Sequence, residues 1–344
     1  MKVLHLLASD RFSGAENVVC QIMNMFKEDA EVEMVYCSPD GQIRESLTEK
    51  GIPFLPLTKL SISQVKQAIK AFGPDVIHAH DVRASLIAAL SFSKKKLISH
   101  NHGNNIDNGL SVKSILYAWA AKRADHIFWV SKAACEGYAF RKTLAHKSSV
   151  LQNVIDIASL LTKCKEDANS YDYDVAYVGR LSAAKNPKRL MQVCRLLVDQ
   201  MPDIKIAIAG SGELEAETKA EHTAQGLQEN VSLLGFVSNP YPLLASSKVM
   251  IMTSIFEGTP MVALEAMALG VPIVSTPVGG MCDLIENGIN GYLCDDDNAF
   301  AQYVTEICMD DTKHQQLSQN ASKRAVEIND LTQYRNQIKK AYDQ

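Results

Sequence analysis

Short apolar runs alternate with helical patterns along most of this chain of 344 residues. The apolar runs of the first half lie at residues 3–7, 32–36, 54–57, 76–79, 97–99 and 127–130, and helical patterns fill most of the intervals between them. Parallel strands that are buried on both faces and joined by crossover helices produce this pattern. We therefore expect an α/β fold built on a doubly wound sheet.

A second alternating series begins at Val175, after a polar break at residues 162–170. A chain of this length is too long for one core of ordinary size and fits two domains. We expect two Rossmann-like domains that face each other across a cleft, at residues 1–165 and 166–328, followed by a last helical pattern within residues 329–344.

The composition is that of a soluble α/β protein, with 47% hydrophobic and 22% charged residues. No apolar run approaches the roughly 20 residues of a membrane helix. The apolar start of the chain is shorter than the core of a signal peptide and is interpreted as a first strand. The eight cysteines are scattered without a C-x-x-C pair, which favours reduced thiols and a cytoplasmic location.

The net charge of −4 is divided unevenly along the chain. Residues 1–160 hold 19 basic and 15 acidic residues, whereas the remainder holds 16 and 24. Ten of the basic residues and only three acidic ones lie within residues 91–147. This excess predicts a basic face on the first domain and an anionic partner for it.

One segment of the basic region, at residues 110–129, is amphipathic. It alternates apolar with basic side chains close to a run of three lysines: Leu116, Tyr117, Trp119 and Ala120 with Lys113, Lys122 and Arg123, near Lys94, Lys95 and Lys96. Basic amphipathic segments bind anionic lipid headgroups. We expect the first domain to touch a membrane surface. The alternative is that Tyr117 and Trp119 belong to the core and that the cations are solvated.

The apolar run Val-Met-Ile-Met at residues 249–252 predicts a buried strand, and residues 253–270 predict a tight turn and a helix after it. Thr259 suits the N-cap, Pro260 suits the first helical position, and Gly270 would end the helix. Free amides at a helix start attract a phosphate, and Gly258 would allow its close approach. The segment therefore predicts a phosphate site.

Two carboxylates bracket this helix start, Glu257 in the turn and Glu265 in the second helical turn. A carboxylate beside a phosphate site suits the vicinal hydroxyls of a sugar or ribose, because it accepts two hydrogen bonds at once. The stretch predicts a site for a sugar nucleotide. The plainer alternative is a capped helix with two solvated glutamates.

Ligands of doubly wound sheets bind beyond the carboxyl ends of the strands. In the second domain, Arg180 and Lys185 lie in such a loop, which Gly179 lets turn sharply, and together they can reach the two phosphates of one pyrophosphate. Solvated cations are the alternative. Two further loops open helices: residues 9–16, whose amides suit a phosphate, and residues 209–213, a dinucleotide fingerprint that lacks its third glycine.

Four histidines lie at the ends of two strands of the first domain: His78, His80, His100 and His102. His80 and His102 could complete a three-ligand metal set with Asp81. We favour the alternative that one histidine lines the cleft as a hydrogen-bond partner while His78 packs along its strand.

The order and spacing of Arg180, Lys185, Glu257 and Glu265 resemble the retaining GT-B glycosyltransferases of family four, and the resemblance covers nearly the whole chain. In that family, Gly-Arg is followed by a lysine and later by two glutamates within F-E-G-x-x-x-x-x-x-E. The resemblance implies the GT-B fold, in which two Rossmann-like domains enclose a cleft. It also implies that the helix within residues 329–344 crosses back to the first domain.

The resemblance implies that Arg180 and Lys185 hold the diphosphate and stabilise its growing charge. It assigns the ribose to Glu265, and hydroxyls of the donor sugar to Glu257 and His102. The candidate catalytic residues are thus Arg180, Lys185, His102 and Glu257. The resemblance also implies contacts between the donor and three further segments. The loop at residues 9–16 would contribute Gly14 and Ala15, and the helix start would contribute Gly258, Thr259, Met261 and Val262. The loop after Leu234 would receive the base at Phe236 and Val237. The family often has glycine in place of Ala15, whose methyl group narrows the approach of a phosphate.

Retaining glycosidases need two carboxyl groups about 5 Å apart, whereas Glu257 and Glu265 would be separated by about 12 Å of rise on one helix. The resemblance therefore favours a front-face reaction, in which the leaving diphosphate assists the acceptor hydroxyl. No metal cofactor is expected, since cationic side chains and helix amides replace it.

The implied donor is a nucleoside-diphosphate sugar, most often of UDP. The implied acceptor is a glycan or a lipid-linked oligosaccharide, as in the biosynthesis of capsules and other bacterial surface polysaccharides, on the inner face of the cell membrane. No nucleic acid is expected as a partner.

Other classes of protein share this fold. A sugar-nucleotide epimerase would need acid and base carboxylates in the first domain, where Asp10, Glu16, Asp81 and Asp107 form no recognisable pair. A non-catalytic protein that binds sugar nucleotides would use the same loops without turnover. A redox dehydrogenase is less favoured because the dinucleotide fingerprint is incomplete.

Overall fold

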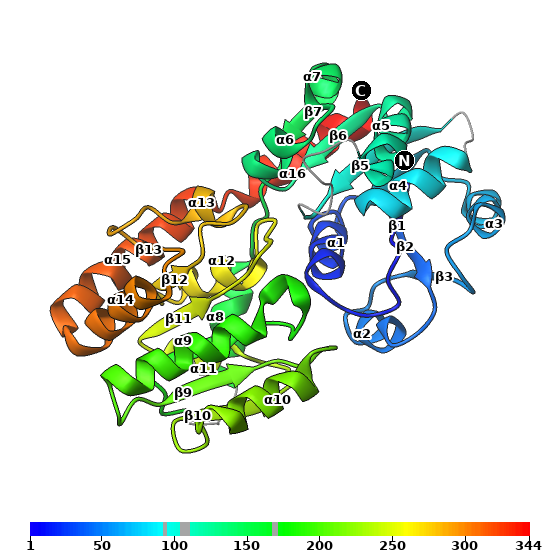
Figure 1. Ribbon diagram of the computed structural model, residues 1–344. Helices are drawn as coiled ribbons and strands as arrows, with labels where there is room; N and C mark the ends of the chain where they lie inside the picture. Colours follow the sequence, from blue (N-terminus) through cyan, green and yellow to red (C-terminus); the bar gives the residue numbers. More distant parts are fainter. Residues whose placement is uncertain (92–94, 104–110, 167–170) are drawn as a thin grey trace. The chain divides into compact units, whose positions relative to one another are not determined.

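The computed structural model describes residues 1–91, 95–103, 111–166 and 171–344 (Figure 1). The chain forms two compact units: unit 1 comprises Met1–Asn153 and Leu331–Gln344, and unit 2 comprises Val154–Asp330. Each unit is a parallel sheet with helices, which confirms the predicted α/β class. Three residues of the sequence predictions lie outside the described residues: Lys94, Asp107 and Leu110.

Unit 1 is built on a seven-stranded sheet with the order β3-β2-β1-β4-β5-β6-β7, and its neighbouring strands are parallel. The strands are β1 (Lys2–Leu6), β2 (Glu33–Pro39), β3 (Phe54–Leu57), β4 (Val76–His80), β5 (Lys96–Asn101), β6 (His126–Trp129) and β7 (Ser148–Val150). The helices are α1 (Gly14–Met25), α2 (Ile43–Glu49), α3 (Ile62–Phe72), α4 (Asp81–Leu90), α5 (Val112–Arg123), α6 (Lys132–Gly137), α7 (Arg141–Leu144), α16 (Leu331–Asp343) and a 3₁₀ turn at Ala145–Lys147.

Unit 2 is built on a six-stranded sheet with the order β10-β9-β8-β11-β12-β13, whose neighbouring strands are also parallel. The strands are β8 (Val175–Val178), β9 (Ile206–Ala209), β10 (Val231–Gly235), β11 (Val249–Met252), β12 (Ile273–Ser275) and β13 (Gly291–Leu293). The helices are α8 (Ile157–Glu166), α9 (Pro187–Gln200), α10 (Glu215–Ala224), α11 (Tyr241–Ser246), α12 (Met261–Ala268), α13 (Met281–Leu284), α14 (Asp297–Met309), α15 (Asp311–Ile328) and a 3₁₀ turn at Ala183–Lys185.

The central strands of both sheets are short and apolar because helices cover both of their faces. All four residues of β11, Val-Met-Ile-Met, are buried. Helix α9 begins where the sequence chemistry places it: the side chain of Asn186 accepts from the amide of Arg189, and Pro187 occupies the first helical position. These elements hold the loops that follow β8 and β11 at one edge of the sheet.

The polar segment at residues 162–170 is not wholly a break, because α8 continues to Glu166. Leu160 is its one fully buried residue among those described, so the polar side chains form the solvent face of a surface helix. Helix α8 lies in unit 2, whereas the expected domain boundary placed most of it in the first domain.

Helix α16 packs on unit 1 although it follows unit 2 in the sequence. Its buried face includes Tyr334, Ile338 and Tyr342. The Tyr342 hydroxyl lies 2.7 Å from Nδ1 of His78, and the guanidinium of Arg335 lies 2.7 Å from the carboxylate of Asp29. This helix thereby covers part of the sheet of unit 1.

Helix α5 divides its predicted amphipathic residues between the core and the surface. Tyr117 and Ala120, expected on a membrane-facing surface, are buried. The Tyr117 hydroxyl lies 2.9 Å from that of Ser99, so this tyrosine belongs to the core. The opposite face of α5 exposes Leu116 and Trp119. Among the described helices, none combines the length and the apolar character needed to cross a membrane.

Candidate active site

Unit 2 carries its predicted site residues on loops that follow adjacent strands. Arg180 and Lys185 follow β8, and Glu257 follows β11, which lies beside β8 in the sheet. Parallel strands bring their carboxyl ends to one edge. The amide of Ile255 donates to the carbonyl of Ala184 at 2.8 Å and joins the two loops directly. The structure therefore brings the predicted lysine and glutamate together.

Lys185 and Glu257 form an ion pair. Nζ of Lys185 lies 2.5 Å from Oε1 of Glu257, and the Ser254 hydroxyl donates to the same oxygen at 2.6 Å. The two charged side chains are 19% and 7% exposed, so the pair is largely removed from water. A buried carboxylate requires partners of this kind. Glu257 thus holds the ammonium group in place, a contact that the sequence did not predict.

Arg180 is paired more loosely. Its guanidinium lies 3.1 Å from the carboxylate of Glu213, and both side chains are about half exposed. Exposed ion pairs contribute only about 0–1 kcal/mol to stability. Arg180 can therefore exchange Glu213 for another anionic partner at little cost.

The glycines of the incomplete dinucleotide fingerprint pack against the loop that carries Arg180. A Cβ atom on Gly210 would lie 1.8 Å from the carbonyl oxygen of Gly179, and one on Gly212 would lie 2.3 Å from that of Leu181. Gly210 also has a φ of +156°, which L-residues rarely adopt. These glycines are explained by the close approach of two backbone segments.

The loop after β12 approaches the turn at Glu257 in the same way. The amide of Gly280 donates to the carbonyl oxygen of Gly258 at 2.6 Å. A Cβ atom on Gly280 would lie 2.0 Å from that oxygen and 2.9 Å from Oγ1 of Thr259. Gly280 thus fixes the position of the turn that precedes α12.

Helix α12 begins one residue later than predicted. Its N-cap is Pro260 rather than Thr259, because Pro260 has an extended ψ of 124° and the first helical residue is Met261. Met261 and Val262 start the helix and are partly buried, and Thr259 is buried in the preceding turn. Gly270, with a φ of +74°, follows the helix end as predicted.

Glu265 lies in the second turn of α12, where the Tyr241 hydroxyl donates to its Oε1 at 3.2 Å. Burial raises the pKa of Glu265 to about 7, and the hydrogen bond from Tyr241 and the charge of Lys163 oppose this rise. Near neutral pH the carboxyl group is therefore divided between its charged and neutral forms. The charged form is an acceptor on both oxygens, whereas the neutral form carries an O–H donor on one of them.

We expect nucleotide binding to strengthen as pH rises from 6 to 8, by up to about tenfold, which is the change in the ionised fraction of a group with a pKa near 7. The sign follows from ionisation, since a carboxylate is a better hydrogen-bond acceptor than the neutral acid for the ribose hydroxyls that the resemblance assigns to Glu265. The dissociation constant for UDP, measured by calorimetry at pH 6, 7 and 8, checks this expectation.

Two variants separate Glu265 from other titrating groups. Glu265→Gln should bind UDP more weakly and lose most of the pH dependence, whereas Glu217→Gln, at an exposed position on α10, should behave as wild type. An unchanged pH profile in Glu265→Gln would contradict the assignment.

The loop after β10 carries the residues predicted to receive the base. Gly235 has a φ of +67°, and the side chain of Phe236 is 78% exposed, while Val237 is partly buried. A pocket of unit 2 is bordered by this loop and its neighbours, and its lining includes Leu181, Gly210 and Gly235. The exposed phenylalanine face is suited to stacking on a flat ring.

In unit 1, Gly14 and Ala15 begin α1. A Cβ atom on Gly14 would meet nothing within 4 Å, so this helix start is open. The Ser13 hydroxyl donates to the carboxylate of Glu16, which is buried under the first turn. Burial raises the pKa of Glu16. Ser13 and Glu16 have the spacing of a capping box, but the Ser13 side chain makes no capping hydrogen bond to the backbone.

The four predicted histidines lie in one buried cluster with a fifth, His5 of β1. Strand register places His5 opposite His78 and His80 opposite His100. His78 stacks on His80 with ring centroids 4.3 Å apart, in agreement with the prediction that it packs along its strand. The sequence prediction overlooked His5, because only the sheet register brings it to this cluster.

The metal set considered from the sequence, His80 and His102 with Asp81, is not among the metal-sized groups of the described residues. Two triplets, His5-His78-His80 and His80-His100-His102, place three ring nitrogens within 4.8 Å of one another. Each triplet contains a pair at hydrogen-bond distance: His5 and His80 at 3.0 Å, and His80 and His102 at 2.8 Å. Asp81, the third predicted ligand, instead accepts from the backbone amide of His102 at 3.0 Å.

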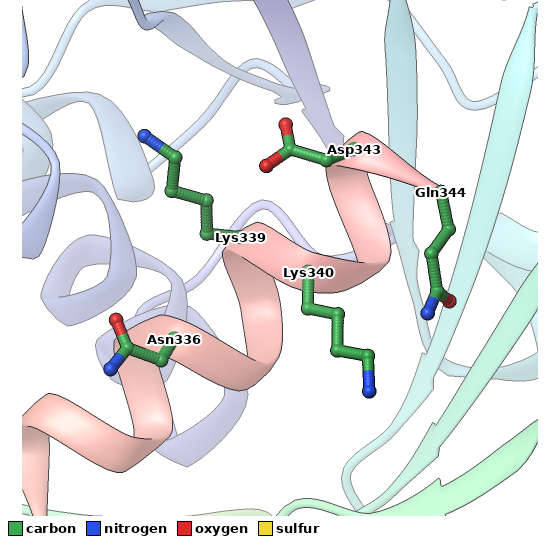
Figure 2. Close-up of a pocket in the computed structure, with 5 residues that line it drawn as sticks. All are labelled: Asn336, Lys339, Lys340, Asp343 and Gln344. Carbon is green, nitrogen blue, oxygen red and sulfur yellow. The ribbon is translucent and has the colours of Figure 1, made fainter.

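A separate hollow lies over α16, outside all of the predicted site residues (Figure 2). Its lining residues belong to the last turns of the chain: Asn336, Lys339, Lys340, Asp343 and Gln344. Lys339 and Lys340 extend to different sides of the helix (Figure 2). These side chains do not converge on one point, so the hollow is a surface feature of α16.

Known proteins with similar sequences and structures are glycosyltransferases. Residues 12–159 match the family model Glycosyltransferase Family 4, and residues 162–324 match the model Glycosyl transferases group 1. The chain is 27% identical over 341 residues to the N-acetylgalactosamine-N,N'-diacetylbacillosaminyl-diphospho-undecaprenol 4-alpha-N-acetylgalactosaminyltransferase of Campylobacter jejuni, covering 91% of each chain. It is 24% identical over 380 residues to the UDP-Gal:alpha-D-GlcNAc-diphosphoundecaprenol alpha-1,3-galactosyltransferase of Escherichia coli, covering 99% of this chain and 96% of the relative.

A solved structure of HepE from Anabaena in complex with UDP and glucose has the same fold. Its TM-score is 0.84 at 22% sequence identity, with 100% of this chain and 99% of that chain covered. The two family models, in this order along the chain, together with this fold, place the protein in the family-four type of GT-B glycosyltransferases.

Proposed function

We propose that this protein transfers a sugar from a nucleoside-diphosphate sugar to a hydroxyl group of a glycan or lipid-linked acceptor, with retention of the anomeric configuration. UDP is the proposed carrier, and the synthesis of a bacterial surface polysaccharide is the proposed setting. The observation that carries the proposal is the buried ion pair between Lys185, on the loop that also carries Arg180, and Glu257, on the loop after β11.

The relatives support the choice of donor and acceptor. HepE was solved with UDP and glucose, and the name of the Escherichia coli relative gives UDP-Gal as its donor. The names of both relatives specify acceptors on diphospho-undecaprenol, a lipid carrier. We extend these substrate classes to this protein as part of the proposal.

In the proposed reaction, the bond between the anomeric carbon and the diphosphate oxygen breaks, and a bond to the acceptor oxygen forms. Negative charge grows on the leaving diphosphate. The ammonium of Lys185 and the guanidinium of Arg180 would stabilise that charge more strongly in the transition state than in the ground state, which is the condition for catalysis. Gly14, Ala15 and the start of α12 would add backbone amides.

The proposed retention rests on a front-face reaction. The acceptor oxygen approaches from the side that the diphosphate leaves, and the proton of the acceptor hydroxyl passes to a diphosphate oxygen. Glu257 is an unsuitable nucleophile because its carboxylate is engaged by Lys185 and Ser254. Its proposed role is to orient Lys185 and to accept hydrogen bonds from hydroxyls of the donor sugar.

An assay with a panel of nucleotide sugars tests the proposal. The protein is incubated with each donor, with and without undecaprenyl-diphosphate-linked acceptors, and the released nucleoside diphosphate is measured. We expect acceptor-dependent release of UDP and an α-linked product from an α-linked donor. Interconversion of sugar nucleotides without release would indicate the epimerase, and binding without either reaction would indicate the non-catalytic alternative.

We also propose that transfer requires no metal cofactor. The diphosphate would be neutralised by Lys185, Arg180 and helix amides, which replace a divalent cation. Activity is therefore expected to persist when EDTA is present in large excess over trace metal. Loss of activity in EDTA that Mn²⁺ or Mg²⁺ restores would overturn this part of the proposal.

Helix α5 is the proposed contact with an anionic membrane. Its exposed face combines apolar positions at helical spacing with flanking cations: Val112, Ile115, Leu116 and Trp119 with Lys113 and Lys122. The guanidinium carbon of Arg123 lies 4.1 Å from the centre of the Trp119 ring. The apolar side chains of such a face insert beneath the headgroups of a membrane. Each well-placed cation adds about 1 kcal/mol of attraction to anionic headgroups.

We expect the protein to sediment with anionic liposomes at low salt and much less with neutral ones. The variant Ile115→Ser/Leu116→Ser/Trp119→Ser should lower the partition coefficient by about tenfold or more, since three apolar side chains are removed. The matched control is Met309→Ser/Val326→Ser, which removes exposed apolar residues of unit 2. Binding of wild type to neither kind of liposome would end the membrane proposal and indicate a soluble acceptor.

A further inference from the structure

Three histidines of unit 1 form a continuous line of hydrogen bonds. Nδ1 of His5 lies 3.0 Å from Nε2 of His80, and Nδ1 of His80 lies 2.8 Å from Nε2 of His102. His5 and His80 are almost completely buried, whereas His102 is partly exposed. We call His5, His80 and His102 the histidine line.

The chemistry of imidazole couples the tautomers of the line. Burial lowers the pKa of all three rings, so each is neutral near pH 7 and carries one N–H group. His80 uses both of its nitrogens within the line, so it must donate to one neighbour and accept from the other. All three protons therefore lie on Nδ1, or all three lie on Nε2.

The two ends of the line decide between these states. With every proton on Nε2, the N–H of His5 would be buried without an acceptor among the described residues, since Nε2 of His5 has no partner. An orphaned buried donor costs about 1–3 kcal/mol. With every proton on Nδ1, the unpaired N–H belongs to His102, whose Nδ1 is likewise buried without a partner among the described residues, so the cost of an orphaned donor is the same at both ends. The ends differ in charge: His102 lies beside the carboxylate of Asp81, which accepts its backbone amide, and this negative charge favours an N–H group at the His102 end.

We propose that His80, supported by His5, is a positioning residue that fixes His102 as the Nδ1–H tautomer, so that His102 presents a hydrogen-bond donor to an oxygen of the bound donor sugar. The identity of the ligand rests on the proposed function. The tautomer of His102 does not depend on that function. Nδ1 of His102 is buried and has no partner among the described residues, so an oxygen of the ligand would supply the acceptor that this nitrogen lacks.

Nuclear magnetic resonance of the full chain labelled with ¹⁵N-histidine tests the tautomer directly. We expect His102 to show a protonated Nδ1 and an unprotonated Nε2 at pH 7, and His80→Phe to give an averaged or reversed pattern. A protonated Nε2, or a mixture, at His102 in the wild type would overturn the inference whatever the transferase assays give.

Activity provides the second readout. His80→Phe retains a ring of similar volume but removes both hydrogen bonds, and kcat/KM should fall about tenfold, the factor for one hydrogen bond of ordinary strength. His80→Gln has an amide that can donate and accept, and should restore much of the loss. Equal activity of wild type and His80→Phe, with an unchanged tautomer at His102, would overturn the inference.

His100→Phe is the matched control. His100 is fully buried and stacks on His102 with ring centroids 4.1 Å apart. Neither of its ring nitrogens has a partner among the described residues, so the same substitution removes no hydrogen bond of the line. Its activity and the tautomer of His102 should remain as in wild type. If the wild-type protein transfers no sugar, the proposed function fails while the spectra still decide the tautomer.

Discussion

Replacing Lys185 by alanine is expected to slow sugar transfer by about two to four orders of magnitude, the scale for removing a group that stabilises developing charge. The ammonium group is held by Glu257 on the adjacent loop and is 19% exposed, so it is already oriented before a diphosphate arrives. Preorganised charges of this kind stabilise a transition state without reorganisation. Turnover under saturating donor and acceptor is the measurement.

The controls separate catalysis from folding. Lys185→Ala leaves the buried Glu257 without its cation, so thermal unfolding must be measured for the same protein. Lys188→Ala removes an exposed lysine three residues away and should leave turnover unchanged. Turnover of Arg180→Ala should be lowered by a factor in the same range as that of Lys185→Ala. Full activity in folded Lys185→Ala protein would refute the assignment of this lysine to the diphosphate.

Gly280→Ala is expected to destabilise unit 2 by roughly 3 kcal/mol or more, within the range of the most damaging single substitutions. The backbone of Gly280 has a φ of −66°, which suits alanine, so the cost would come entirely from overlap with the carbonyl oxygen of Gly258. The overlap would also displace the turn that carries Glu257, and turnover should fall with stability. Denaturant unfolding and activity are measured together.

Gly226→Ala is the comparison for Gly280→Ala. Gly226 has a φ of +64° but open space around its Cβ position, so alanine there should cost only about 1–2 kcal/mol from the left-handed backbone. If Gly280→Ala proved no more damaging than Gly226→Ala, the close approach of the two loops would not be a determinant of the site.

The layout of the fold could be predicted because a buried parallel strand is recognisable from its own short apolar run. The run Val-Met-Ile-Met predicts a buried strand whatever surrounds it, and the structure confirms it as β11. Local chemistry was less decisive at the start of α12. Proline at residue 260 favours the first helical position, but its extended ψ of 124° makes it the N-cap and places the helix start at Met261.

Contacts between distant residues were the part that the sequence could not provide. Lys185 and Glu257 are 72 residues apart, and their pairing depends on β8 lying beside β11. The raised pKa of Glu265 depends on burial by tertiary packing. Tyrosine is a residue type that often lies at a membrane interface, yet Tyr117 lies on the side of α5 that faces the core. Each of these outcomes is set by the order of elements in the sheets.

The separation of unit 1 into two stretches of sequence has a consequence for biosynthesis. The chain leaves unit 1 at Asn153 and returns to it only at Leu331, so a ribosome must make all of unit 2 before α16 exists. Until then, the buried ring of His78 lacks the Tyr342 hydroxyl that lies 2.7 Å from it in the finished protein. The part of the unit 1 sheet that α16 covers therefore stays uncovered while unit 2 is synthesised.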